Sequence, residues 1–237
     1  YDTAHKLALL TSLAFGTQID ADAIYVEGIS AITPLDLKMA DDLGFRIKLL
    51  GVAERTRTGI EQRVHPTMVP RDSSIAQVMG VTNAVTIDAD AVGELTLIGP
   101  GAGGDATASA VLADIADVAG TPARPPFGWP VSQMEVAQRA PMQRHEGGYY
   151  VRLSVYDRPG AAAGIATHMA ENDISLESIL QRRSEAAALD PTGRSGALVP
   201  VVLITYATTE GAVREAIRQI AEDGLIAVKD AYRKIYS

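Results

Sequence analysis

A β-α-β pattern that occurs twice toward the C-terminus constrains the fold of this 237-residue chain more than any other feature. In 149–157, apolar and polar residues alternate with a period of two, which is typical of a half-buried strand. After a break at 158–160, the next segment has helical spacing, with one apolar face formed by Ala162, Ile165, Ala166 and Met169. A strand at 174–181 completes the first unit.

The second unit follows about fifty residues later. It begins with a strand at 198–206 and ends with a strand at 225–235. The helix between them has an apolar face made of Val213, Ala216, Ile217 and Ile220. Two such units joined through 184–197 predict a ferredoxin-like βαββαβ sandwich, with four antiparallel strands backed by two helices.

The stretch 121–148 divides the chain, because it holds five of the twelve prolines and shows neither helical nor strand periodicity. We interpret it as a linker. Residues 1–120 are predicted to form an α+β domain whose mixed sheet is mostly antiparallel. The expected helices are 3–15, 33–44, 74–80 and 105–120, and the expected strands are 24–30, 46–55, 59–69, 83–90 and 93–99. The second helix should have Thr33 as its N-cap, Pro34 in its first turn and Gly44 at its end.

Charge and composition exclude several classes of function. The net charge of −8 disfavours binding to nucleic acid and to anionic membrane surfaces. Without cysteine, the chain has no disulfide, no thiolate nucleophile and no cysteine-ligated metal, and it fits a reducing compartment such as the cytoplasm. The four histidines are scattered, so we expect no histidine-built metal site. The Tyr1-Asp2 start is interpreted as a cut end.

The first predicted helix carries an acid and an amine four residues apart. Asp2 and Lys6 fall within the apolar stripe formed by Leu7, Leu9, Leu10, Leu13 and Ala14, so we expect both on the inward face. One interpretation is an ordinary ion pair at a helix end. The other is catalytic, since a partly buried lysine held by a carboxylate can transfer a proton at neutral pH.

A glycine-rich loop at 99–104 follows a predicted strand and matches G-x-G-x-x-G. The helix after it leads into the linker and not into a second parallel strand, and Asp105 at its start would oppose a phosphate. Three interpretations remain: a nucleotide site, a tight turn required for packing, or a loop that completes a site begun elsewhere.

The turn at 157–160 leads into a helix whose free N–H groups suit the carboxylate of a small acid. The alternative is a plain strand-to-helix turn, which needs proline and glycine in any case. The charge runs Arg182-Arg183 and Glu222-Asp223 are interpreted as solvated faces.

Two tracts are similar to known families. VYDRPGAAAGIATHMAENDISLESILQ (155–181) and its repeated βαβ unit resemble an ACT domain, a small regulatory module that binds amino acids. The tracts 1–16, 25–51, 65–69 and 98–115 resemble the catalytic domain and C-terminal return segment of homoserine dehydrogenase. The combined order resembles that of bacterial homoserine dehydrogenases with an ACT tail.

The resemblance implies that 1–120 form a catalytic, substrate-binding and dimerisation domain, and that 149–237 form an ACT regulatory domain. The implied reaction is the NAD(P)-dependent interconversion of L-aspartate 4-semialdehyde and L-homoserine in threonine, methionine and isoleucine biosynthesis. Lys6 would transfer the proton at the substrate oxygen, and Asp2 would bind or orient the substrate. The loop residues Gly101, Ala102 and Gly103 would lie near the nicotinamide.

The ACT resemblance implies an effector site made by Asp157, Arg158, Gly160 and Asn172, with threonine as the expected effector. Ala161 and Ala162 replace the larger aliphatic residues usual in the family, which predicts weak or lost binding. Because ACT sheets pair through their edges, we expect a homo-oligomer.

The family's N-terminal nucleotide-binding domain is missing from the sequence. We therefore expect the chain to be a fragment that binds no coenzyme and has no activity by itself. The alternative function is a non-catalytic module for amino-acid sensing or assembly.

Overall fold

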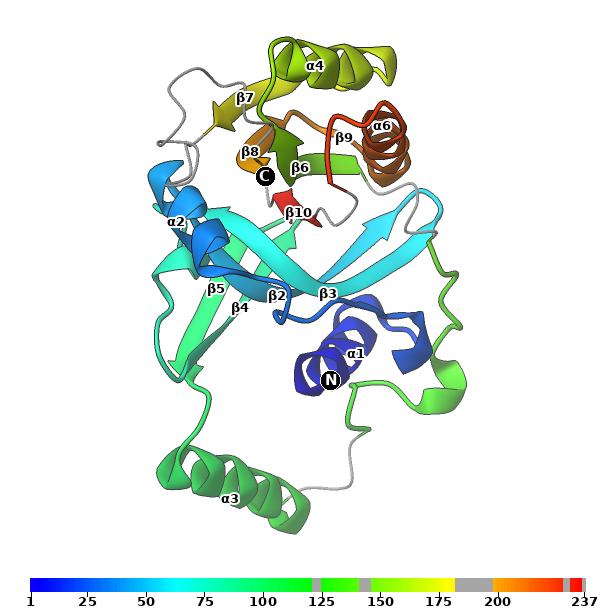
Figure 1. The fold of residues 1–237 in the computed structure, drawn as a ribbon. Helices are drawn as coiled ribbons and strands as arrows, with labels where there is room; N and C mark the ends of the chain where they lie inside the picture. The colour runs from blue at the N-terminus through cyan, green and yellow to red at the C-terminus, as the bar shows by residue number, and fades with distance from the viewer. Residues whose placement is uncertain (121–124, 141–145, 182–197, 228–230, 236–237) are drawn as a thin grey trace.

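The computed structural model describes residues 1–120, 125–140, 146–181 and 198–227, together with the backbone of 231–235 (Figure 1). The helices are α1 (Asp2–Phe15), α2 (Pro34–Asp42), α3 (Gly104–Gly120), α4 (Ala161–Glu171) and α6 (Glu210–Glu222), with short 3₁₀ turns η1 (Ala21–Ala23), η2 (Ile75–Gln77) and η3 (Val131–Gln133). Among these residues, no helix is both long and apolar enough to cross a membrane.

One large sheet runs through the molecule in the strand order β1-β3-β10-β6-β8-β7, with β2 paired to β3 and β9 to β6. Its strands are β1 (Tyr25–Val26), β2 (Phe45–Thr56), β3 (Gly59–Pro70), β6 (Glu146–Tyr156), β7 (Leu176–Gln181), β8 (Leu198–Thr205), β9 (Thr208–Thr209) and β10 (Ala231–Ile235). A separate hairpin consists of β4 (Thr82–Ala89) and β5 (Gly93–Pro100).

The C-terminal part has the predicted βαββαβ order, and its strands β10, β6, β8 and β7 pair antiparallel. Helices α4 and α6 cover one face of this sheet (Figure 1). The alternation in β6 explains this side, because every second residue enters the core beneath the helices. That core includes Tyr149, Val151, Leu153, Val155, Ile165, Met169, Val213 and Ile220. The ferredoxin-like prediction is confirmed.

The two parts of the chain share the large sheet. β10 pairs in parallel with β3, with Lys234 opposite Thr67, and antiparallel with β6 on its other side. The second face of the C-terminal sheet is covered by α2, whose Met39 packs with Tyr150 in a core shared by both parts. The rest of that core is Ala40, Met68, Val202 and Ile204. The junction is therefore a continuous sheet with a helix over it.

Local signals in the N-terminal part are largely confirmed. The cap of α2 is a complete capping box, in which the Thr33 side chain accepts from the Asp36 backbone N–H and the Asp36 carboxylate accepts from the Thr33 backbone N–H. The predicted hairpins are present as β2–β3 and β4–β5. Two predictions are wrong: the helix at 74–80 is only the 3₁₀ turn η2, and the strand at 24–30 shortens to β1. Both segments are too short for periodicity alone to decide their state.

Part of the predicted linker packs on the N-terminal part. Ile60 donates a backbone hydrogen bond to Gln138 at 2.8 Å, and Ala140 donates one to Ile60 at 3.1 Å. Gly59, at φ +138°, is required there, since a Cβ atom would overlap the Gln138 carbonyl. Met134 is buried as well.

In contrast, α3 packs against little of the described chain. None of its side chains is buried, and Val118 is 85% exposed. Figure 1 shows α3 at the end of the molecule opposite α4.

Candidate functional site

The candidate catalytic pair lies on the first turns of α1. Lys6 Nζ donates to Asp2 Oδ2 at 2.7 Å, and the two side chains are 58% and 80% exposed. The hydrogen bond from Lys6, and then the positive charge of Lys6, lower the pKa of Asp2. The pair is formed, but it is open to solvent.

The predicted orientation of α1 is wrong. Its buried residues are Ala4, Leu7, Ala8, Thr11 and Ser12, whereas Leu9, Leu10 and Leu13 are exposed on the opposite side with the ion pair. That side packs on the β2–β3 hairpin, where Ala4 and Leu7 pack with Val64 and where Thr3 and Leu7 lie beside Gly51. The leucine-rich stripe therefore faces away from the hairpin.

The glycine loop joins β5 to α3. The Gly101 N–H donates to Val81 O at 3.0 Å, and a Cβ atom at Gly101 would overlap the Asn83 side chain. Gly103 has φ +125°, and its carbonyl accepts from the N–H and hydroxyl of Thr107. Close approach to Asn83 therefore explains Gly101, and backbone conformation explains Gly103. Both are expected if the loop is a tight turn required for packing. Ala102 lies between them and is exposed.

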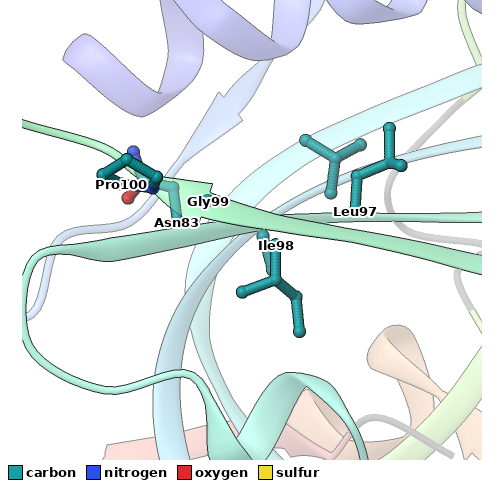
Figure 2. A pocket seen from close by; sticks show the side chains of 7 residues that line it. Asn83, Leu97, Ile98, Gly99 and Pro100 are labelled. Carbon is teal, nitrogen blue, oxygen red and sulfur yellow. The ribbon is translucent and has the colours of Figure 1, made fainter. Parts of the chain in front are cut away.

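A shallow hollow of about 310 Å³ lies on the hairpin beside this loop (Figure 2). It is lined by Asn83, Ala84, Val85, Leu97, Ile98, Gly99 and Pro100. Figure 2 shows Asn83 and Pro100 together at one end, with Leu97 and Ile98 further along β5. The lining offers apolar side chains and one amide, and no charged group.

The predicted effector turn contains Gly160, which is the N-cap of α4 and has a φ of +88°. It borders a hollow of about 180 Å³ lined by Val155, Tyr156, Asp157, Arg158, Gly160, Ala161, Ala162, Ala163, Gln181 and Val201. Arg158 also donates to Gly224 O at 3.2 Å, at the end of α6. The structure thus brings Asp157, Arg158 and Gly160 to one hollow.

Asn172 does not join them. It caps the other end of α4, where its amide donates to Gln219 Oε1 at 2.7 Å and to His168 O at 2.8 Å. An 11-residue helix is about 16 Å long, so Asn172 is far from the hollow of its own chain. In this chain it links α4 to α6.

A buried polar contact that the sequence did not predict joins the two parts of the chain. Asp36, on α2, is 2% exposed and accepts from Tyr150 Oη at 3.0 Å and from Arg152 Nε at 2.8 Å. Tyr150 and Arg152 belong to β6. A sequence signal existed for Asp36, since it stands at the third helical position after Thr33.

A row of polar side chains on β3 was also missed. These residues occupy every second position of the strand, and all of them are buried: Glu61, Arg63, His65 and Thr67. Arg63 pairs with Glu61, and its Nε lies 3.1 Å from His65 Nε2. Within the described ranges, no group of three or more His, Cys, Asp or Glu side chains is placed to hold a metal ion.

Comparisons with known proteins match both parts. A family model described as homoserine dehydrogenase matches residues 1–116, and one described as ACT domain matches residues 149–222. Homoserine dehydrogenases of Pseudomonas aeruginosa and Neisseria gonorrhoeae are 41% and 40% identical, over 91% and 92% of this chain but 49% and 50% of their own lengths. The chain thus spans about half the length of the curated relatives it matches.

A solved structure agrees. The crystal structure of a homoserine dehydrogenase from Thiobacillus denitrificans has a TM-score of 0.86 and 36% sequence identity. The match covers 100% of this chain and 53% of that one.

Proposed function

Because residues 1–116 of this chain belong to the homoserine dehydrogenase family and residues 149–222 are an ACT domain, we propose that it supplies the substrate-binding and regulatory parts of an NAD(P)-dependent homoserine dehydrogenase. The reaction would interconvert L-aspartate 4-semialdehyde and L-homoserine. The observation that carries this proposal is the formed Asp2–Lys6 pair on a face of α1 that the described residues leave uncovered.

Lys6 is proposed to move the proton at the substrate oxygen. Its ammonium has three N–H donors, and Asp2 Oδ2 accepts one of them, which orients the group. Another donor can then reach the aldehyde oxygen as it becomes an alkoxide, and the proton passes to that oxygen when the alcohol forms. Asp2 can also accept a hydrogen bond from the polar end of the substrate.

The described residues do not fit a dinucleotide by themselves. The Asn83 side chain fills the space beside Gly101, and Asp105 in the first turn of α3 would repel a phosphate. We therefore place the coenzyme's own site in a domain outside these 237 residues. The loop Gly101, Ala102 and Gly103 is proposed to border the nicotinamide there.

Two uncovered helix faces support such a domain. On α1, the exposed leucines lie beside the ion pair, and on α3 the exposed apolar residues are Val111, Leu112, Ile115 and Val118. Helices in globular proteins usually bury their apolar stripe. We infer that the nucleotide-binding domain covers both faces and excludes water from Lys6.

The test is to join this chain to the N-terminal half of the Pseudomonas aeruginosa relative and to assay homoserine-dependent reduction of NAD⁺ and NADP⁺. We expect Lys6→Ala to lower kcat by about 10²- to 10⁴-fold without changing coenzyme affinity, because it removes a proton-transfer group. Lys38→Ala, an exposed lysine on α2, is the matched control and should behave like the parent. Equal losses of turnover and coenzyme affinity in Lys6→Ala would contradict the assignment.

The 237-residue chain alone should show no homoserine-dependent reduction of either coenzyme. Measurable activity would contradict the proposal that the coenzyme site lies elsewhere. A joined protein that folds and binds coenzyme yet never turns over would favour the non-catalytic sensing module instead.

The hollow at 155–163 is proposed to bind a small amino acid, with threonine the first candidate. The ACT match and the N-terminal end of α4 support this, since the positive end of a helix dipole can bind a carboxylate. The three alanines at 161–163 leave the walls short, so we expect weak binding. Calorimetry with threonine, isoleucine and methionine tests it, and no heat with any of them would refute it.

We also propose a cytoplasmic homo-oligomer. β3 already occupies one edge of the ACT sheet by pairing with β10, so β7 is the edge strand left for a second copy among the described strands. Asn172 can contact an effector only in the hollow of such a copy. Light scattering that finds only monomer at micromolar concentrations would refute the oligomer.

A further inference from the structure

The contact between α2 and β6 is centred on one buried carboxylate, that of Asp36. Oδ2 accepts from the Thr33 backbone N–H at 2.8 Å and from the Thr33 hydroxyl at 2.7 Å. Oδ1 accepts from Tyr150 Oη and Arg152 Nε. One oxygen therefore completes the cap of α2, and the other binds the ACT sheet.

This arrangement exceeds what a helix cap needs. A capping box works with an exposed acid at the third helical position and requires no cation. Here the carboxylate is buried, and a buried charge is stable only while its partners remain in place. The ionised Asp36 therefore joins β6 to α2, in addition to the apolar core that the two elements share.

On the ACT side, β6 connects this contact directly to the proposed effector hollow. Arg152 lies on the same continuous strand as Val155 and Tyr156, which line the hollow. The turn at Asp157 follows immediately. A shift at the end of β6 is therefore transmitted along a hydrogen-bonded strand to Arg152.

On the other side, α2 connects the contact to the proposed catalytic helix. Met39 of α2 packs with Met68 of β3 in the shared core, and Phe45 and Ile47 of β2 lie against it. The same β2–β3 hairpin supports α1, because Val64 packs with Leu7. Asp36 thus stands between the hollow and the element that carries Lys6.

We propose that the Asp36–Tyr150–Arg152 contact is the coupling element through which occupancy of the hollow at 155–163 changes the position of α2 and of the hairpin beneath α1. This inference rests on the proposed effector function. A ligand that binds more tightly to one position of β6 shifts the equilibrium between two positions of α2. The size of the shift is set by the difference in the ligand's affinity for the two positions.

Hydrogen exchange tests the coupling on the 237-residue chain. Amide exchange of 34–42 is compared with and without saturating threonine, isoleucine or methionine. In the parent chain we expect an effector to change exchange of this segment by roughly 5- to 150-fold, the usual range of coupling. Tyr150→Phe and Arg152→Met should lose that response, and Arg218→Met, an exposed arginine on α6, should keep it. An equal response in all four chains would overturn the inference.

Binding and coupling are separated by calorimetry on the same samples. If an effector binds the parent but exchange of 34–42 does not change, the coupling fails while the effector site stands. If none of the three amino acids binds, the effector function fails. In that case Ala162→Leu takes the place of the ligand, because the larger side chain fills the hollow. If amide exchange of 34–42 is the same in this variant as in the parent, the coupling is overturned independently of the effector function.

Discussion

Removal of the Arg152 charge should destabilise the junction between the two parts of the chain. Breaking a buried ion pair from one side costs about 3–5 kcal/mol, because the remaining charge stays buried. Arg152 is 18% exposed, and Asp36 keeps its hydrogen bonds from Thr33 and Tyr150, so we expect the lower end, about 3 kcal/mol, for Arg152→Met. Urea unfolding followed by circular dichroism measures the loss.

The loss should depend on pH. Burial of the Asp36 carboxyl favours its protonated form, but the hydrogen bonds from the Thr33 hydroxyl and N–H and the charge of Arg152 outweigh burial and lower its pKa. A pKa lowered by folding stabilises the protein above the unfolded value of about 4, and that contribution is lost as the pH falls through the folded value. The penalty of Arg152→Met should therefore be constant above about pH 4 and shrink as the pH falls below that value.

A double-mutant cycle measures the interaction energy between Asp36 and Arg152 and can refute this reasoning. Asp36→Asn removes the charge that Arg152 neutralises, so the double variant should be less destabilised than the sum of the single variants, by about 1–3 kcal/mol. Additive losses, or a penalty independent of pH, would refute the reasoning. Arg218→Met removes an arginine paired only with exposed acids on α6, and should cost less than about 1 kcal/mol.

Two glycine substitutions test close approaches. Gly101→Ala should lower the free energy of unfolding by less than about 1 kcal/mol, because the exposed Asn83 side chain that it would meet can rotate away. Gly59→Ala should cost more than about 2 kcal/mol, because its φ of +138° and the nearby Gln138 carbonyl are both backbone constraints, and no side-chain change should rescue it. Thermal unfolding measures both, and a neutral Gly59→Ala, or a Gly101→Ala that costs as much as Gly59→Ala, would contradict the geometry.

The candidate site was only partly predictable. The spacing of Asp2 and Lys6 predicted an ion pair, which the structure contains. Asp157 and Gly160 border one hollow, and their role as effector residues stays a prediction. The contact of Asp36 with Arg152 was not predicted, because in the sequence Arg152 is only the polar side of an alternating strand. Its partner comes from a distant helix that no local pattern connects to it.

The sequence by itself determined the elements that depend on neighbouring residues: the doubled β-α-β unit, the two hairpins and the cap at Thr33. These follow from side-chain periodicity and from the backbone preferences of a few residues. The tertiary structure alone decided which side of α1 is buried and that β10 pairs with β3. Both depend on surfaces brought together from distant parts of the chain. The side of α1 with Ala4 and Leu7 is buried because it meets Val64 on a hairpin distant in the sequence, and a two-residue parallel pairing leaves no periodic signal.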